Sequence, residues 1–169
     1  MRKGLAPALA VLTVGLAALG AAALRARAPE GAEALPPAER AEVEATARLF
    51  TRLAAHLKGS GGDPRFAERI PAAPAVVEEL LAEAAFVDRA GRREEPRLQR
   101  IELGTPVRVA PGRVRIDARE LWVTRVVARG GQPLETRSDV ISVRYLLDAD
   151  RGRWQVAAWS LIGPGGEGR

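Results

Sequence analysis

An uncharged stretch of 20 residues near the N-terminus, Leu5 to Leu24, constrains this chain more than any other feature. A helix rises about 1.5 Å per residue, so this stretch matches the roughly 30 Å hydrocarbon core of a bilayer. Basic residues flank it on both sides: Arg2, Lys3, Arg25 and Arg27. We therefore predict that residues 1–27 form a single-pass N-terminal membrane anchor. The remaining domain is then expected on the extracytoplasmic side of a cell membrane.

The same segment also has the layout of a cleaved signal peptide. Residues 1–4 would be its basic start, residues 5–19 its apolar region, and Ala21–Ala23 its cleavage site of small residues. The domain would then be secreted rather than tethered. Both readings send it across the membrane, and the retained anchor is our working hypothesis.

The distribution of charge argues against a nucleic-acid partner, although the isoelectric point is about 10.8. Four of the 26 basic residues flank the apolar stretch, which leaves 22 basic against 21 acidic residues. Nucleic-acid modules concentrate positive charge on one face. The densest basic cluster has acidic residues within it and is predicted to be a solvated loop; it comprises Arg89, Arg92, Arg93, Arg97 and Arg100.

The rest of the sequence predicts helices first and strands second. Residues 28–37 are rich in proline and glycine and predict a linker. Apolar residues three or four positions apart predict helices over 38–58 and 74–89, and Asp63-Pro64 predicts the start of a short helical turn to about Arg69.

Beyond Pro96 apolar residues alternate with polar ones, which predicts about four strands joined by short turns. The alternation changes parity near Arg119-Glu120, and we expect a β-bulge there. Residues 163–169 are expected to be a flexible tail. The predicted fold class is α+β, with helices packed on one face of a curved antiparallel sheet.

The closing hairpin, Val140 to Trp159, carries a family resemblance. With its Gly152–Val156 segment (Gly-Arg-Trp-Gln-Val) and the helix-then-strand order, the soluble domain over 38–162 resembles the nuclear transport factor 2-like cone fold of SnoaL-like cyclases and ketosteroid isomerases. The added anchor resembles the bitopic assembly subunits of conjugation and type IV secretion systems, or the Mce-associated membrane proteins. The Asn-Pro-x-Gly turn of many Gram-negative secretion subunits is absent. The resemblance implies a fold more than an activity.

Few residues offer catalytic chemistry. The chain has no cysteine, which excludes disulfides, thiolate metal sites and a cysteine nucleophile. His56 is the only histidine and lies in the first predicted helix. Asp117, Asp139 and Tyr145 lie on predicted strands, and with His56 they would line a cone pocket if the protein bound or converted a small apolar molecule. Surface ion pairs for the two aspartates and core packing for Tyr145 are the simpler expectations.

Three tryptophans lie on predicted strands, and Trp154 belongs to the resembling segment. Trp122 and Trp159 are candidate interface anchors, with core packing as the alternative. We therefore predict a non-catalytic membrane-anchored interaction domain of the bacterial envelope, without cofactor or metal. Its expected partners are the membrane and other proteins of an envelope complex of the conjugation or secretion kind, and a homo-oligomer is left open.

Overall fold

A computed structural model describes residues 34–163 of the chain. The expected anchor (1–27), most of the expected linker and residues 164–169 lie outside the described residues. Within 34–163, none of the helices combines the length and the apolar character needed to cross a bilayer.

Three helices precede the sheet, as the sequence predicts. They are α1 (Pro37–Gly59), the short α2 (Pro64–Ala67) and α3 (Pro74–Arg89). The Asp63 side chain accepts a hydrogen bond from the Arg65 backbone amide (3.0 Å) and so caps α2, as expected from the Asp-Pro pair. The apolar stripe of α1 is buried along its length, at Val43, Ala47, Phe50, Ala54 and Leu57.

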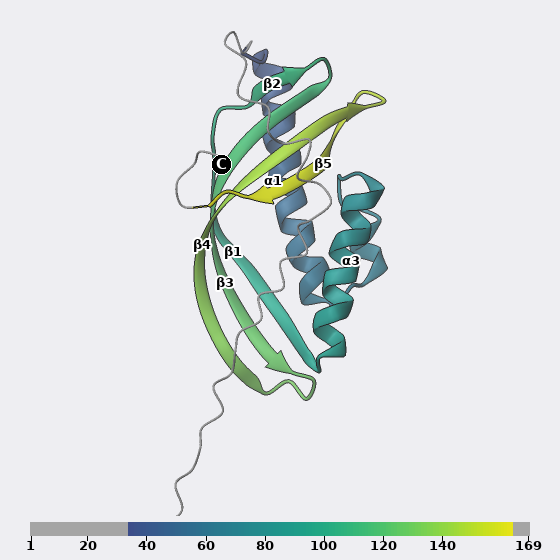
Figure 1. The fold of residues 1–169 in the computed structure, drawn as a ribbon, viewed down its shortest axis with the longest axis vertical. Helices are drawn as coiled ribbons and strands as arrows, with labels where there is room; N and C mark the ends of the chain where they lie inside the picture. Colours follow the sequence, from purple (N-terminus) through teal and green to yellow (C-terminus); the bar gives the residue numbers. More distant parts are fainter. Residues whose placement is uncertain (1–33, 164–169) are drawn as a thin grey trace, which may run out of the picture.

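Five antiparallel strands follow rather than about four. They are β1 (Arg92–Leu103), β2 (Val107–Ala110), β3 (Arg113–Ala128), β4 (Pro133–Asp150) and β5 (Arg153–Leu161). Their spatial order is β1-β3-β4-β5, and β2 also pairs with β3. Figure 1 shows β1, β3 and β4 as long curved arcs with α1 and α3 on their concave side. The α+β class and the curved antiparallel sheet are confirmed.

Four of the five arginines in the basic cluster lie in a strand and Arg89 ends α3, so the prediction of a loop there is wrong. Arg92 to Arg100 belong to β1, which pairs with the second half of β3. The periodicity of β1 is hidden because most of its side chains are charged, and several neutralise each other at the surface, as Arg93 does with Glu95 (2.8 Å). The chain then breaks at Gly104, whose amide donates to the Asp117 carbonyl (2.7 Å), before β2 begins.

The predicted bulge in β3 is also wrong. The irregularity lies on the neighbouring strand, where the β1–β3 register shifts between Leu98 and Arg100. β3 itself keeps one parity, because its even-numbered residues face inward from Val114 to Val126. The consequence is that Glu120 faces the core, where an apolar residue was expected.

The core lies between the inner face of the sheet and α1. Its most deeply buried side chains include Leu57, Leu80, Ile116, Leu147 and Val156. Leu35, within the expected linker, is only 9% exposed and belongs to this core, and Ala34 bridges to Val107 of β2. The folded domain therefore starts before α1.

Candidate functional site

Of the four side chains expected around a cone pocket, only Tyr145 points into the core, where it is 3% exposed. His56 is exposed on the last turn of α1 and stacks on Phe66, with ring centroids 5.5 Å apart. Asp117 lies on the outer face of β3, and Asp139 is exposed on β4. The structure therefore does not bring these four residues together.

A polar cluster that the sequence did not single out surrounds Tyr145. Its centre is Glu120 of β3, which is 2% exposed. Tyr145 Oη donates to Glu120 Oε1 at 2.5 Å, and Trp122 Nε1 donates to Glu120 Oε2 at 2.8 Å. Thr51 of α1 completes the group, with its Oγ1 3.1 Å from the Tyr145 hydroxyl and 3.4 Å from Glu120 Oε1. We call these four residues the Glu120 cluster.

Burial dominates the electrostatics of the Glu120 cluster. It raises the pKa of Tyr145 well above its ordinary value, and the negative charge of Glu120 and the hydrogen bond to it act in the same direction. Among the described residues, the hydrogen-bond partners of the Glu120 carboxylate are neutral hydroxyl and indole groups. A buried carboxylate held only by neutral donors has its hydrogen bonds satisfied but no opposite charge beside it.

The sequence pattern did not indicate Glu120, because the apolar neighbours Leu121 and Val123 predict that the opposite face of β3 is buried at this point. The available signal was parity, since Glu120 continues the even-numbered series of Val114, Ile116 and Ala118. A carboxylate in such a series indicates one of two things: the strand leaves the core at that residue, or the core holds a buried polar site there.

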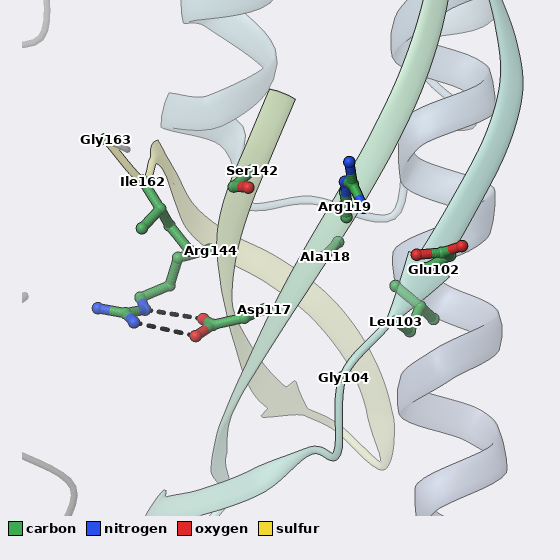
Figure 2. Close-up of a pocket in the computed structure, with 10 residues that line it drawn as sticks. All are labelled: Glu102, Leu103, Gly104, Asp117, Ala118, Arg119, Ser142, Arg144, Ile162 and Gly163. Carbon is green, nitrogen blue, oxygen red and sulfur yellow. Dashed lines mark hydrogen bonds and ion pairs between the residues drawn. The ribbon is translucent and has the colours of Figure 1, made fainter. Parts of the chain in front are cut away.

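A hollow lies on the outer face of the sheet and not in its core. It measures about 520 Å³ and is lined by β3, β4, the end of β1 and the residues after β5. Figure 2 shows Asp117 and Arg144 pointing toward each other at its side. The Arg144 guanidinium donates two hydrogen bonds to Asp117 (2.8 and 2.9 Å), which raises the pKa of Arg144. This pair neutralises itself, and the other charged side chains that line the hollow are Glu102, which pairs with Arg100 (2.7 Å), and Arg119.

No cluster of carboxylate and imidazole groups suited to a metal ion occurs in residues 34–163. The second hollow within this range is small and lies between Lys58 and Glu83, which pair at 2.9 Å. Neither of these two hollows reaches the Glu120 cluster.

The candidate anchors Trp122 and Trp159 both lie half-buried. Trp122 is fixed by its hydrogen bond to Glu120. Trp159 packs against the core opposite Tyr145, and its buried indole nitrogen has no hydrogen-bond partner in the described part of the chain. Both side chains are held by contacts within the fold and are partly exposed, and their role as interface anchors stays a prediction.

Two other strand edges are each contacted at one residue by another part of the chain. Helix α1 lies along β1, where Arg48 donates to the Ile101 carbonyl (3.3 Å). The edge of β5 pairs with residues 71–73, since Ala73 donates to the Val156 carbonyl (2.9 Å) and Val156 donates to Pro71 (2.8 Å). These contacts satisfy backbone groups that would otherwise be open to another chain.

The first half of β4 has an open edge. β5 pairs only with Val143–Asp150, so residues 133–141 are bonded to β3 on one side and to no described strand on the other. Residues 133–140 are exposed on both faces, including Leu134 (52%) and Val140 (56%). We call residues 133–141 the free edge of β4.

The comparisons with known proteins find a likeness of fold. No family model and no curated protein matches the sequence. The intermembrane space region of the chloroplast protein ARC6 superposes with a TM-score of 0.63 at 12% identity, over 75% of this chain and 98% of that one. This likeness shows a shared fold.

Two other solved structures align less closely. An uncharacterised Caulobacter vibrioides protein with a cystatin-like fold has a TM-score of 0.46 at 15% identity, over 73% of this chain and 92% of that one. Aln2 from a Streptomyces species has a TM-score of 0.43 at 18% identity, over 76% of this chain and 93% of that one. At these scores neither supports a functional argument.

Proposed function

We propose that this chain is a non-catalytic interaction domain, tethered to a membrane by residues 5–24, that binds another protein along the free edge of β4. The observation that carries the proposal is the edge itself. Unpaired backbone N–H and C=O groups in a row form a template on which an extended segment of a partner can add as a further strand. The edges of β1 and β5 are each contacted by another segment, at Ile101 and at Val156, whereas residues 133–141 pair with no described strand on their outer side.

The packing of the core supports binding at the surface over chemistry inside the sheet. Leu147, Ile116 and Val143 fill the space around Tyr145, and each is at most 1% exposed. A small-molecule binder or enzyme needs a concave site with convergent polar groups. The Glu120 cluster supplies the polar groups, so a small ligand remains the second candidate, but the two hollows described above lie elsewhere.

The finer proposal is that the partner belongs to an envelope complex of the conjugation or type IV secretion kind. Its support is the uncharged stretch Leu5–Leu24 together with the order of helices and strands. Genes for an ATPase and a coupling protein beside the gene for this chain would agree with it. A neighbourhood of lipid-uptake genes would instead favour the Mce-associated type.

Site-specific photo-crosslinking of the full chain in its own cells tests the binding surface. A photoreactive phenylalanine at Thr136 or Val140 is expected to give adducts with an envelope protein. Ser138→Pro is expected to abolish them, because proline removes a backbone donor from the free edge of β4 and is tolerated on edge strands. Ser138→Ala, the matched control, keeps the donor and should keep the adducts.

Adducts that persist in the Ser138→Pro variant would show that the partner does not pair with this strand. The fold of each variant is checked by the emission of its three tryptophans. A photoreactive residue at exposed Glu79 on α3 reports background labelling.

A further inference from the structure

We infer that the occupant of the free edge of β4 is a second copy of this chain, paired antiparallel about a two-fold axis at Ser138. The inference rests on the proposed function in that it uses the same edge, and it names the partner. It follows from three features of the strand: the direction of its backbone groups, the order of its charges and the position of its exposed apolar side chains.

The backbone groups of the even-numbered residues point away from β3. The Ser142 carbonyl accepts from the Ile162 amide (2.8 Å) on the β5 side, whereas the Ala149 amide donates to the Gly112 carbonyl (2.8 Å) on the β3 side. Backbone groups alternate in direction along a strand, and the β3–β4 register is regular from Glu135 to Asp148. Thr136, Ser138 and Val140 therefore offer their N–H and C=O groups to a new strand.

The charges of the odd-numbered residues select the register. Glu135, Arg137 and Asp139 alternate in sign along one face of the free edge. A two-fold axis at Ser138 sets Arg137 of each copy opposite Asp139 of the other, which makes two favourable cross-strand pairs. An axis at Arg137 or at Asp139 would set like charges directly opposite each other, which is unfavourable.

A two-fold axis at Thr136 would also pair opposite charges, but it leaves Val140 beyond the end of the paired segment. The axis at Ser138 sets Val140 opposite Thr136 of the second copy. Val140 is more than half exposed in the single chain (56%). Pairing about Ser138 therefore covers this exposed apolar residue of the free edge.

Arg137 already makes ion pairs within its own chain, so dimerisation would exchange one of these partners for Asp139 of the second copy. Arg137 bonds Glu94 of β1 across the inner face of the sheet (3.0 Å) and lies 3.4 Å from Asp139 of its own strand. Charges of one sign on an edge strand protect it from self-association by repulsion. Here the signs alternate, so the same charges repel in the registers centred on Arg137 or Asp139 and attract in those centred on Ser138 or Thr136.

The absence of cysteine makes disulfide crosslinking of single-cysteine variants a clean test on the full chain in cell membranes. In an antiparallel hydrogen-bonded pair the Cα atoms are about 5.5 Å apart, within the range that a disulfide spans. Ser138→Cys is expected to form a disulfide-linked homodimer on mild oxidation. Thr136→Cys alone is not expected to form one, because the two Cys residues at position 136 in the two chains would lie about 13 Å apart along the strand. Co-expressed Thr136→Cys and Val140→Cys chains are expected to crosslink to each other.

Charge reversal distinguishes specific pairing from disulfides that form by random collision of two chains. Arg137→Asp in the Ser138→Cys background is expected to lose the crosslinked dimer, because it sets two carboxylates opposite each other. The double reversal Arg137→Asp with Asp139→Arg restores the opposite signs and should restore the dimer. Failure of the double reversal to restore it would overturn the register.

The outcomes separate this inference from the proposed function. If Ser138→Cys gives no homodimer while photo-adducts at Thr136 or Val140 contain a different protein, self-pairing is wrong and the interaction surface stands. If Thr136→Cys crosslinks to itself in preference to Ser138→Cys, the two-fold axis at Ser138 is wrong. If neither disulfide-linked dimers nor photo-adducts form at the free edge of β4, both proposals fail.

Discussion

Tyr145 donates its hydroxyl proton to Glu120 at 2.5 Å, from one strand to the next across the inner face of the sheet. Trp122 donates to the other carboxylate oxygen, and Thr51 approaches from α1. The Glu120 cluster thus links the helix to β3 and β4 through polar contacts in a core that is mainly apolar. A buried network of this kind contributes to stability only when each of its members is satisfied.

Replacing Glu120 with alanine is expected to destabilise the fold. The change leaves the Trp122 indole and the Tyr145 hydroxyl without their acceptor and opens a cavity, at a cost of about 2–4 kcal/mol in the free energy of unfolding. Urea denaturation of the full chain, followed by tryptophan fluorescence, measures the loss.

Glu102→Ala is the matched control for this prediction. Glu102 is a partly exposed carboxylate at the end of β1 and pairs with Arg100 at the surface (2.7 Å). Such pairs contribute little, so its loss should cost less than about 1 kcal/mol. Equal effects of the two substitutions would show that the Glu120 cluster adds nothing beyond a surface carboxylate.

The ionisation of Tyr145 can be followed without interference, because it is the only tyrosine in the chain. Burial, with help from Glu120, raises its pKa in the folded state. The folded state therefore holds the phenol proton more tightly than the unfolded state, whose tyrosine pKa is about 10. The stability that this group contributes is complete below that pH and is lost progressively as the pH rises above it.

Absorbance at 295 nm should show this directly. In strong denaturant the tyrosine is expected to titrate near pH 10. In the native protein phenolate should be delayed to higher pH and appear together with unfolding. A native titration curve that coincides with the denatured one would contradict the burial and bonding of Tyr145.

The ion pair between Asp117 and Arg144 should contribute far less than the Glu120 cluster. Its two side chains are 42% and 23% exposed on the outer face of the sheet. Cross-strand charge pairs of this kind are worth about 0.2–1 kcal/mol. A double-mutant cycle with Asp117→Asn and Arg144→Gln measures the coupling, which should shrink in 1 M salt, where the screening length is about 3 Å. A coupling of several kcal/mol that salt does not change would be incompatible with a solvent-exposed pair.

The helices and the general architecture could be predicted because their signal is local. The stripe from Val43 to Leu57 and the Asp63-Pro64 start are properties of neighbouring residues. Strand β1 could not be found in the same way. Its residues are mostly charged, and only pairing with the distant second half of β3 makes Arg92 to Arg100 extended.

The Glu120 cluster was missed for a related reason. Its four members come from α1, β3 and β4, so nothing in the local sequence shows that they meet. The free edge of β4 likewise depends on where β5 stops pairing, at Val143, and on residues 71–73 covering β5. Such features depend on contacts between distant segments, which periodicity alone does not report.

Leu35 provides a test of where the folded domain begins. The sequence assigns it to a linker, but it is 9% exposed and packs in the core ahead of α1. Leu35→Ala should lower the free energy of unfolding by about 2–3 kcal/mol, since a buried leucine loses its contacts and leaves a cavity. Leu134→Ala, at a leucine that is 52% exposed on the free edge of β4, should change it by less than about 0.5 kcal/mol in a dilute sample. A neutral Leu35→Ala would return residues 34–36 to the linker and move the start of the domain to α1.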